Sequence, residues 1–174
     1  MLLSDLAAGA PGAAVETGGA CDVRRVVQDS RVTGPGDLFV AVRGLRHDGH
    51  DFAAEAARAG AAVAVERPVP LPPGTPSLRL ADSRWALGEL AALLHGRPAR
   101  RLRVIGVTGT AGKSTTTHLV AHLLEASGRR AGYLSTVAHG TPDVAADNRS
   151  GQTTMEAPEV QAWLARMAAI RSPG

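Results

Sequence analysis

The chain has 174 residues, of which 44% are hydrophobic, 3% aromatic and 20% charged, and its net charge is +3. This composition suits a globular protein of one large or two small domains, with a core of small aliphatic residues. The arginines are scattered and form no basic tail, which argues against nucleic-acid binding. No apolar run is long enough for a membrane span and no leader pattern is present, so we expect a cytoplasmic protein without membrane contact. The single cysteine, Cys21, excludes an intrachain disulfide.

Strand and helix patterns alternate through the first half of the chain. In order, they predict a helix over 2–8, strands over 23–27 and 37–42, a helix over 51–59, strands over 61–65 and 78–80, and a helix over 83–95. The stretch 67–76 holds five prolines and one glycine, so we expect a loop there. This order is typical of a small α/β unit.

A second α/β unit begins after a boundary near residues 96–101. Its patterns predict a strand over 103–108, a helix over 114–127, a strand over 131–136, a surface loop over 139–152 and a helix over 157–169. A parallel sheet needs more than two strands for a stable core. We therefore expect an α/β protein with a small first domain over 1–98, followed by an incomplete parallel-sheet domain over 99–174 that belongs to a longer protein.

The most informative motif lies where the first strand of this second unit meets its helix. Residues 104–117 read Val-Ile-Gly-Val-Thr-Gly-Thr-Ala-Gly-Lys-Ser-Thr-Thr-Thr. Glycines let backbone N–H groups approach phosphate oxygens, and the N-terminus of the following helix attracts the same anion. Lys113 adds a positive charge for the outer phosphates, and the Ser114 hydroxyl suits Mg²⁺. The motif predicts binding of a nucleoside triphosphate, although Val107 stands where the standard spacing has its first glycine.

Three segments together resemble the Mur ligases, specifically the enzymes that add a diamino acid to a UDP-N-acetylmuramoyl dipeptide. The first segment comprises Asp29-Ser30-Arg31 with the runs 35–44 and 48–52, and the second is the phosphate loop, 106–116. The third is Thr-Thr-Met-Glu-Ala-Pro-Glu-Val-Gln over 153–161. Their order and separation also fit, and the resemblance covers nearly the whole chain.

The resemblance implies an ATP-dependent amide ligation in peptidoglycan precursor synthesis. ATP phosphorylates the free carboxylate of UDP-MurNAc-L-Ala-D-Glu, and an amine of meso-diaminopimelate or L-Lys then attacks the acyl phosphate. The family's modified lysine, later metal-binding acid and amino-acid pocket would lie beyond residue 174, so we expect this chain to be inactive alone. We also expect it to be a monomer.

Site residues are carried over from the family position by position. The ATP-binding residues are Gly109, Thr110, Ala111, Gly112, Lys113, Ser114 and Thr115, with Lys113 in the catalytic role and Ser114 on Mg²⁺. The residues expected to contact the UDP-MurNAc substrate are Gln28, Ser30, Leu45, Arg46, His47, Gln152, Thr153 and Thr154.

Other functions remain open at this point. A non-catalytic nucleotide-binding remnant would share the phosphate loop, as would a small kinase, although the segment around Asp29-Ser30-Arg31 disfavours the kinase. A relative that adds D-Ala-D-Ala is the nearest alternative among the ligases, and the segment 153–161 favours the diamino-acid type.

Overall fold

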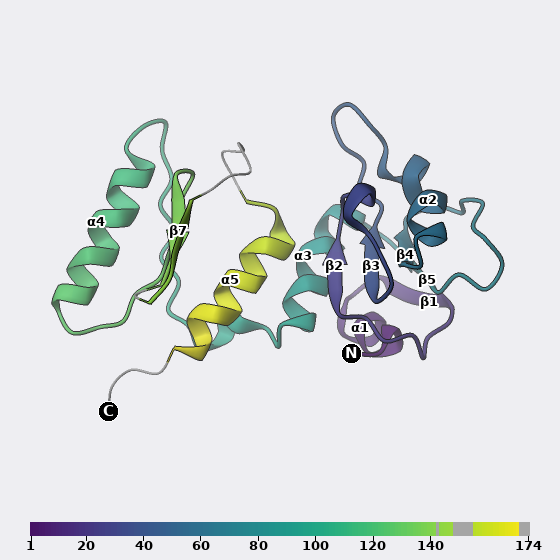
Figure 1. Ribbon diagram of the computed structural model, residues 1–174, viewed down its shortest axis with the longest axis horizontal. Helices are drawn as coiled ribbons and strands as arrows, with labels where there is room; N and C mark the ends of the chain where they lie inside the picture. Colours follow the sequence, from purple (N-terminus) through teal and green to yellow (C-terminus); the bar gives the residue numbers. More distant parts are fainter. Residues whose placement is uncertain (142, 148–154, 171–174) are drawn as a thin grey trace. The chain divides into compact units, whose positions relative to one another are not determined.

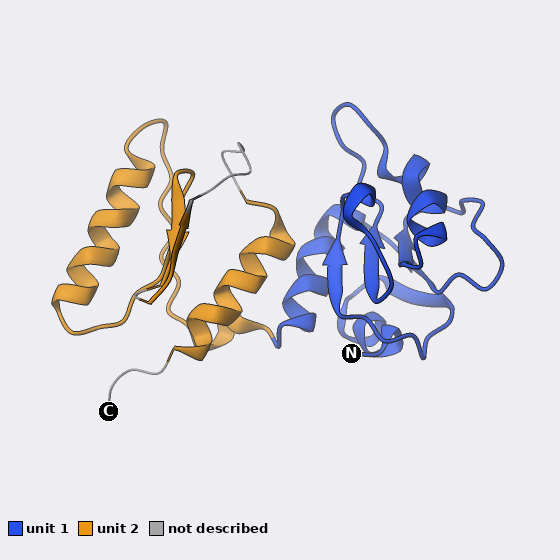
Figure 2. Ribbon diagram, in the orientation of Figure 1, with its two compact units in different colours: residues 1–96 blue, residues 97–174 orange. Residues whose placement is uncertain are grey.

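The computed structural model describes residues 1–141, 143–147 and 155–170 of the chain. The chain folds as two compact units, Met1–Gly96 and Arg97–Gly174 (Figure 2). Each unit contains both helices and strands, so the predicted α/β class is confirmed.

A five-stranded sheet forms the centre of the first unit. Its order is β1-β5-β4-β3-β2, and the strands are β1 (Ala13–Thr17), β2 (Arg25–Val27), β3 (Asp37–Val40), β4 (Ala62–Val65) and β5 (Ser77–Leu80). Strands β2 to β5 pair in parallel, whereas β1 pairs antiparallel with β5 at the edge. Strand β1 was not predicted from the sequence, because an edge strand that is mostly exposed carries little apolar alternation.

Helices cover both faces of this sheet. Helix α2 (Ala53–Arg58) contacts β4 on one face, whereas α3 (Ser83–Leu94) contacts β2 and α1 (Leu3–Gly9) on the other (Figure 1). Every residue of β3 and β4 is buried, as expected for parallel strands covered on both sides. The core on the α2 side consists of small aliphatic residues around one aromatic ring; it comprises Phe39, Ala41, Ala53, Ala56, Ala61, Val63 and Val65.

The second unit holds an antiparallel sheet between two helices (Figure 1). Its strands are β6 (Tyr133–Leu134), β7 (Ala138–Gly140) and β8 (Ala145–Asp147), in the order β6-β7-β8. Helix α4 (Lys113–Ala126) contacts β6, and Trp163 of α5 (Ala157–Ala169) packs its ring 4.5 Å from that of His139 in β7. Both helices therefore lie close to the predicted ranges.

Two expectations for this unit are wrong. The described residues 103–108 form no strand, and Val104 and Ile105 stay 63% and 62% exposed. A β-branched run becomes a strand only when a neighbouring strand accepts its backbone hydrogen bonds, and β6 is paired with β7 instead. The loop predicted over 139–152 contains β7 and β8 in its described part, so the described strands of this unit are antiparallel rather than parallel.

An ion pair between exposed Arg25 and buried Asp37 joins the starts of β2 and β3. Asp37 is 4% exposed, and its carboxylate accepts two hydrogen bonds from Arg25, at 2.8 and 2.6 Å, and one from the Gly34 N–H at 2.9 Å. Arg25 also donates to the carbonyl oxygen of Val32, in the turn after β2. The Arg25 guanidinium, helped by the Gly34 N–H, holds the pKa of Asp37 below its usual range.

We predict that Asp37→Asn lowers the free energy of unfolding by about 2 kcal/mol at pH 7, because charge-assisted hydrogen bonds are lost. Since the folded-state pKa is lowered, this stabilisation is present above the unfolded-state pKa, about 3.9, and is lost as the pH falls through the folded-state value. Urea unfolding of both proteins at pH 7 and pH 3 tests this. Exposed Asp51, substituted by Asn, serves as the matched control, and a pH-independent difference for Asp37→Asn would contradict the prediction.

The backbone approaches Gly49 closely. A Cβ atom at this position would lie 2.7 Å from both the backbone nitrogen and the carbonyl oxygen of Val42. Backbone atoms move less readily than side-chain ends, so we predict that Gly49→Ala destabilises the first unit by about 1–3 kcal/mol. Gly34→Ala is the matched control, because a Cβ there meets nothing within 4 Å. Thermal unfolding measures both, and equal melting temperatures would contradict the prediction.

Candidate functional site

The phosphate loop leads directly into helix α4. Gly109 and Gly112 adopt positive φ angles of 148° and 77°, which favour glycine. Gly112 is the N-cap of α4, and in the described part of the chain no side chain caps this end. The first N–H within the helix to find a carbonyl is that of Thr116, which donates to Gly112 at 2.9 Å. Among the described residues we find no carbonyl partner for the N–H groups of Lys113, Ser114 and Thr115 in the first turn of α4, so these groups are available to an anion.

Lys113 is the only lysine in the sequence, since the other 18 of the 19 Lys and Arg residues are arginines. Its ammonium donates to the carbonyl oxygen of Gly109 at 2.7 Å and so folds back over the loop that precedes the helix. An ammonium carries three donors, so two remain for phosphate oxygens.

Described residues line a pocket of about 290 Å³ in the first unit and one of about 220 Å³ in the second. The pocket of the second unit combines the first turns of α4 with the turn that follows β6. Its lining residues are Val107, Lys113, Ser114, Thr117, Leu134, Ser135, Thr136, Met155 and Val160. Lys113 and Ser114 both line this pocket, and their roles towards a nucleotide stay predictions.

The hydroxyl groups of Ser135 and Thr136, which also line this pocket, were not predicted from the sequence. The Ser114 and Thr136 hydroxyl oxygens lie 2.9 Å apart, and the His118 ring nitrogen Nε2 lies 3.2 Å from the Ser135 hydroxyl. His118 also packs against the Tyr133 ring, with 4.4 Å between ring centroids. Ser135 and Thr136 directly follow β6. This position at the end of a strand was the feature of the sequence that could have pointed to them.

In the first unit, the predicted substrate residues follow the carboxyl ends of two neighbouring strands. Gln28 follows β2 directly, and Ser30 begins the 3₁₀ turn η1 (Ser30–Val32). Asp29 caps this turn and binds the Arg31 guanidinium, which holds the pKa of Asp29 below its usual range. Within the described residues we find no hydrogen bond from the Ser30 hydroxyl, which leaves it available to a ligand.

Leu45, Arg46 and His47 form an exposed turn beyond β3. The Gly44 N–H donates to the His47 carbonyl at 2.9 Å, and Arg43 and Asp48 form an isolated β-bridge at the base of the turn. Because β2 and β3 are parallel neighbours, this turn and the Ser30 turn leave the same edge of the sheet. Gln152, Thr153 and Thr154 lie outside the described residues, so their predicted contacts stay predictions.

A buried histidine fastens the 43–48 turn to the sheet. His50 is 5% exposed; its Nδ1 lies 2.6 Å from an Asp48 oxygen, and its Nε2 accepts from the Glu66 N–H at 3.0 Å. Nε2 is therefore the acceptor and Nδ1 carries the proton. The backbone N–H and ring of His50, with Arg67, hold the pKa of Asp48 below its usual range.

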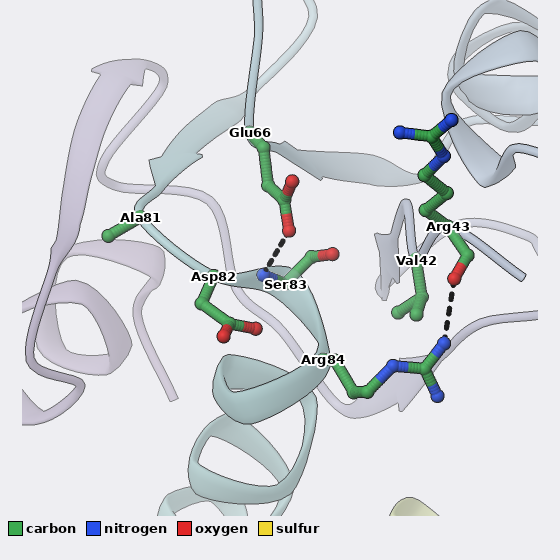
Figure 3. A pocket seen from close by; sticks show the side chains of 7 residues that line it. All are labelled: Val42, Arg43, Glu66, Ala81, Asp82, Ser83 and Arg84. Atoms are coloured by element: carbon green, nitrogen blue, oxygen red, sulfur yellow. Dashed lines mark hydrogen bonds between the residues drawn. The ribbon is translucent and has the colours of Figure 1, made fainter.

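The pocket of the first unit lies where β3, β4 and β5 end and α3 begins (Figure 3). Glu66 points towards Ser83 and accepts from its N–H at 2.6 Å, while Asp82 caps α3 by accepting from the Trp85 N–H at 2.9 Å. Arg84 donates to the Arg43 carbonyl across the pocket at 2.7 Å. The two carboxylates already satisfy this helix end, so it is poorly suited to binding a further anion.

The described residues contain no helix that is both long and apolar enough to cross a membrane. They also contain no group of three or more His, Cys, Asp or Glu side chains placed to hold a metal ion.

Two parts of the chain match one family of ligases. Residues 22–93 match the Mur ligase family catalytic domain, and residues 107–171 match the Mur ligase middle domain. The chain belongs to the Mur ligase family, and the two matches fall in its two compact units.

The relatives in this family are much longer than the chain. It is 46% identical over 153 residues to UDP-N-acetylmuramyl-tripeptide synthetase of Roseiflexus sp. (strain RS-1), which covers 84% of this chain and 29% of the relative. It is 42% identical over 138 residues to UDP-N-acetylmuramoyl-L-alanyl-D-glutamate--2,6-diaminopimelate ligase of Geobacillus thermodenitrificans (strain NG80-2), covering 79% of this chain and 28% of that one. The chain therefore spans less than a third of the length of these curated relatives.

A solved structure supports the fold. The chain is similar in structure to a UDP-N-acetylmuramoyl-L-alanyl-D-glutamate--2,6-diaminopimelate ligase, with a TM-score of 0.72 that covers 97% of this chain and 33% of the other. At 22% identity this similarity concerns the fold alone.

We predict that His50→Phe lowers the free energy of unfolding by about 1–3 kcal/mol, because it keeps an aromatic ring but removes both ring hydrogen bonds. His50→Gln retains an acceptor for the Glu66 N–H, so its loss is expected to be smaller. Urea unfolding followed by far-ultraviolet circular dichroism ranks the two variants, and the reverse order would refute the role assigned to His50.

Proposed function

We propose that this chain supplies the UDP-substrate-binding unit and the phosphate loop of an ATP-dependent ligase of peptidoglycan precursor synthesis. The reaction adds a diamino acid, meso-diaminopimelate or L-Lys, to UDP-MurNAc-L-Ala-D-Glu through an acyl phosphate. The observation that carries the proposal is the uncapped start of α4, where a lone lysine and a serine line one pocket. The names of the curated relatives support the choice of substrate.

The phosphate loop suits the transfer of a phosphoryl group to a carboxylate. Such a reaction depends on charge neutralisation and positioning more than on covalent catalysis. The free N–H groups at the start of α4 would hold the phosphate oxygens, and Lys113 would place its charge on the outer phosphates. Position 112 favours glycine because its φ of 77° is a backbone conformation that a side chain would strain.

The pocket also suits a magnesium ion that is bound mainly through phosphate. The Ser114 hydroxyl lines the pocket, whereas none of its described lining residues is acidic. Mg²⁺ keeps several waters and is commonly held by few protein groups together with substrate phosphates. Ser114 would thus be the protein ligand, and the ion would neutralise charge on the phosphates.

The two turns at the carboxyl edge of the first sheet would hold the uridine diphosphate part of the substrate. Ser30 offers a hydroxyl, Gln28 an amide, and the Leu45–His47 turn its exposed backbone and side chains. Open α/β sheets bind ligands beyond the carboxyl ends of their strands, which supports this placement.

The lone lysine allows a direct test of the nucleotide site. An amine-selective acetylating reagent has two targets in this chain, the Lys113 ammonium and the α-amine of Met1, which is paired with Asp22. We predict that MgADP slows acetylation of Lys113 at least about fivefold, while the rate at Met1 stays unchanged and serves as an internal control. Mass spectrometry of the labelled peptides measures both rates, and equal protection at the two amines would refute the assignment.

Calorimetry of the same protein separates the two ligands. Lys113→Ala is expected to weaken MgADP binding by about tenfold or more, which corresponds to the loss of a charge-assisted contact. Binding of UDP-MurNAc-L-Ala-D-Glu is expected to stay within about twofold of the unaltered protein, since its contacts lie elsewhere. If the folded chain binds neither ligand, the proposed function is wrong for this chain and it is a non-catalytic remnant.

A further inference from the structure

A short turn after β6 holds one hydroxyl group against the start of α4. The Ser135 hydroxyl donates to the Ala138 carbonyl at 2.7 Å and accepts from the N–H of Ala138 at 3.1 Å. The Ser135 N–H donates to the same carbonyl at 3.0 Å. These bonds close the turn around Thr136, so the Thr136 hydroxyl has a defined position when it meets Ser114.

Helix α4 is held to this turn at two neighbouring levels. Ser114 meets Thr136 at 2.9 Å, and one helical turn further on His118 meets Ser135 at 3.2 Å. Residues i and i+4 lie on the same face of a helix, so the two contacts fix the rotation of this face against the turn. The side chain of Ser114 is thereby held at the pocket rather than free to rotate.

A hydroxyl oxygen that binds a cation uses a lone pair that could otherwise accept a hydrogen bond. The hydroxyl proton must then be donated to a separate acceptor. A serine hydroxyl has one donor and two lone pairs. If the Ser114 hydroxyl donates its hydrogen bond to Thr136, the lone pairs of the Ser114 oxygen stay available to a cation in the pocket. If Thr136 donates to Ser114 instead, the Ser114 proton would point towards the cation. Groups that orient a metal ligand in this way affect metal affinity strongly.

We propose that Thr136 is a positioning residue of the nucleotide site. Its hydroxyl accepts a hydrogen bond from the Ser114 hydroxyl and so turns the Ser114 oxygen towards the magnesium ion that accompanies the nucleotide. This inference rests on the proposed function, because it requires that the pocket bind a nucleotide with Mg²⁺. It adds a residue that lies 22 positions beyond Ser114 and outside the phosphate-loop motif.

The test compares ADP affinity with and without Mg²⁺ in the 174-residue chain by titration calorimetry. Thr136→Val keeps the shape but has no hydroxyl, and it is expected to reduce the Mg²⁺-dependent gain in ADP affinity by about tenfold, the lower end for groups that orient metal ligands. ADP affinity measured in EDTA is expected to stay unchanged. Thr136→Ser keeps the hydroxyl and is expected to retain the gain.

Two further variants separate positioning from general damage. Thr17→Val makes the same chemical change at an exposed position of β1 in the first unit and is expected to leave both affinities unchanged. In a Ser114→Ala background, Thr136→Val is expected to have no additional effect on the Mg²⁺-dependent gain, because it acts through Ser114.

The outcomes also distinguish this inference from the proposed function. If the unaltered chain binds MgADP but Thr136→Val keeps the full gain, or loses affinity equally with and without Mg²⁺, the role of Thr136 is refuted while the nucleotide site stands. An additive effect in the Ser114→Ala background refutes it in the same way. If the unaltered, folded chain binds no ADP at all, the proposed function fails and this inference fails with it.

Discussion

Parallel pairing of β2 to β5 is the constraint on which the organisation of the first unit depends. It places the carboxyl ends of all four strands at one edge of the sheet. The loops that follow these strands therefore lie at the same edge although they are distant in sequence. The Ser30 turn, the Leu45–His47 turn and the Glu66–Ser83 contact all lie beyond these strand ends. The ion pair of Arg25 and Asp37 secures the opposite ends of β2 and β3, and so supports the register that places the turns.

The N-termini of α3 and α4 show how similar helix ends acquire different chemistry. At α3, Asp82 and Glu66 accept from the N–H groups of Trp85 and Ser83, so two carboxylates occupy the positive end of the helix. At α4 the N-cap is Gly112, which has no side chain to offer. The first end is satisfied within the protein and adds stability, whereas the second leaves donors for a phosphate. A pocket beside a helix N-terminus therefore indicates an anion site only where no side chain of the protein already caps that helix.

Polar contacts between elements complete both candidate sites. His50 connects Asp48, at the base of an exposed turn, with the backbone at the end of β4, so the turn is held without a ligand. Ser135 and Thr136 connect β6 with α4 in a similar way. In each unit, a small set of buried or half-buried polar groups holds residues that are expected to contact a ligand, and such support is what a binding site requires.

The sequence by itself determined the elements whose signals are local. The helices near 83–94, 113–126 and 157–169, the strands of the first sheet except β1, and the glycine-lysine-serine loop all follow from periodicity, capping and motif, which act over a few residues. The Mur ligase resemblance followed from short motifs in a fixed order. Only the tertiary structure decided which strands find partners: Val104 and Ile105 have strand character but no neighbouring strand among the described residues, whereas residues 138–140 and 145–147 have weak patterns and do pair. It also decided that Thr136 meets Ser114 and that His50 joins Asp48 to Glu66, because contacts across 16 to 22 residues depend on packing that no local pattern encodes.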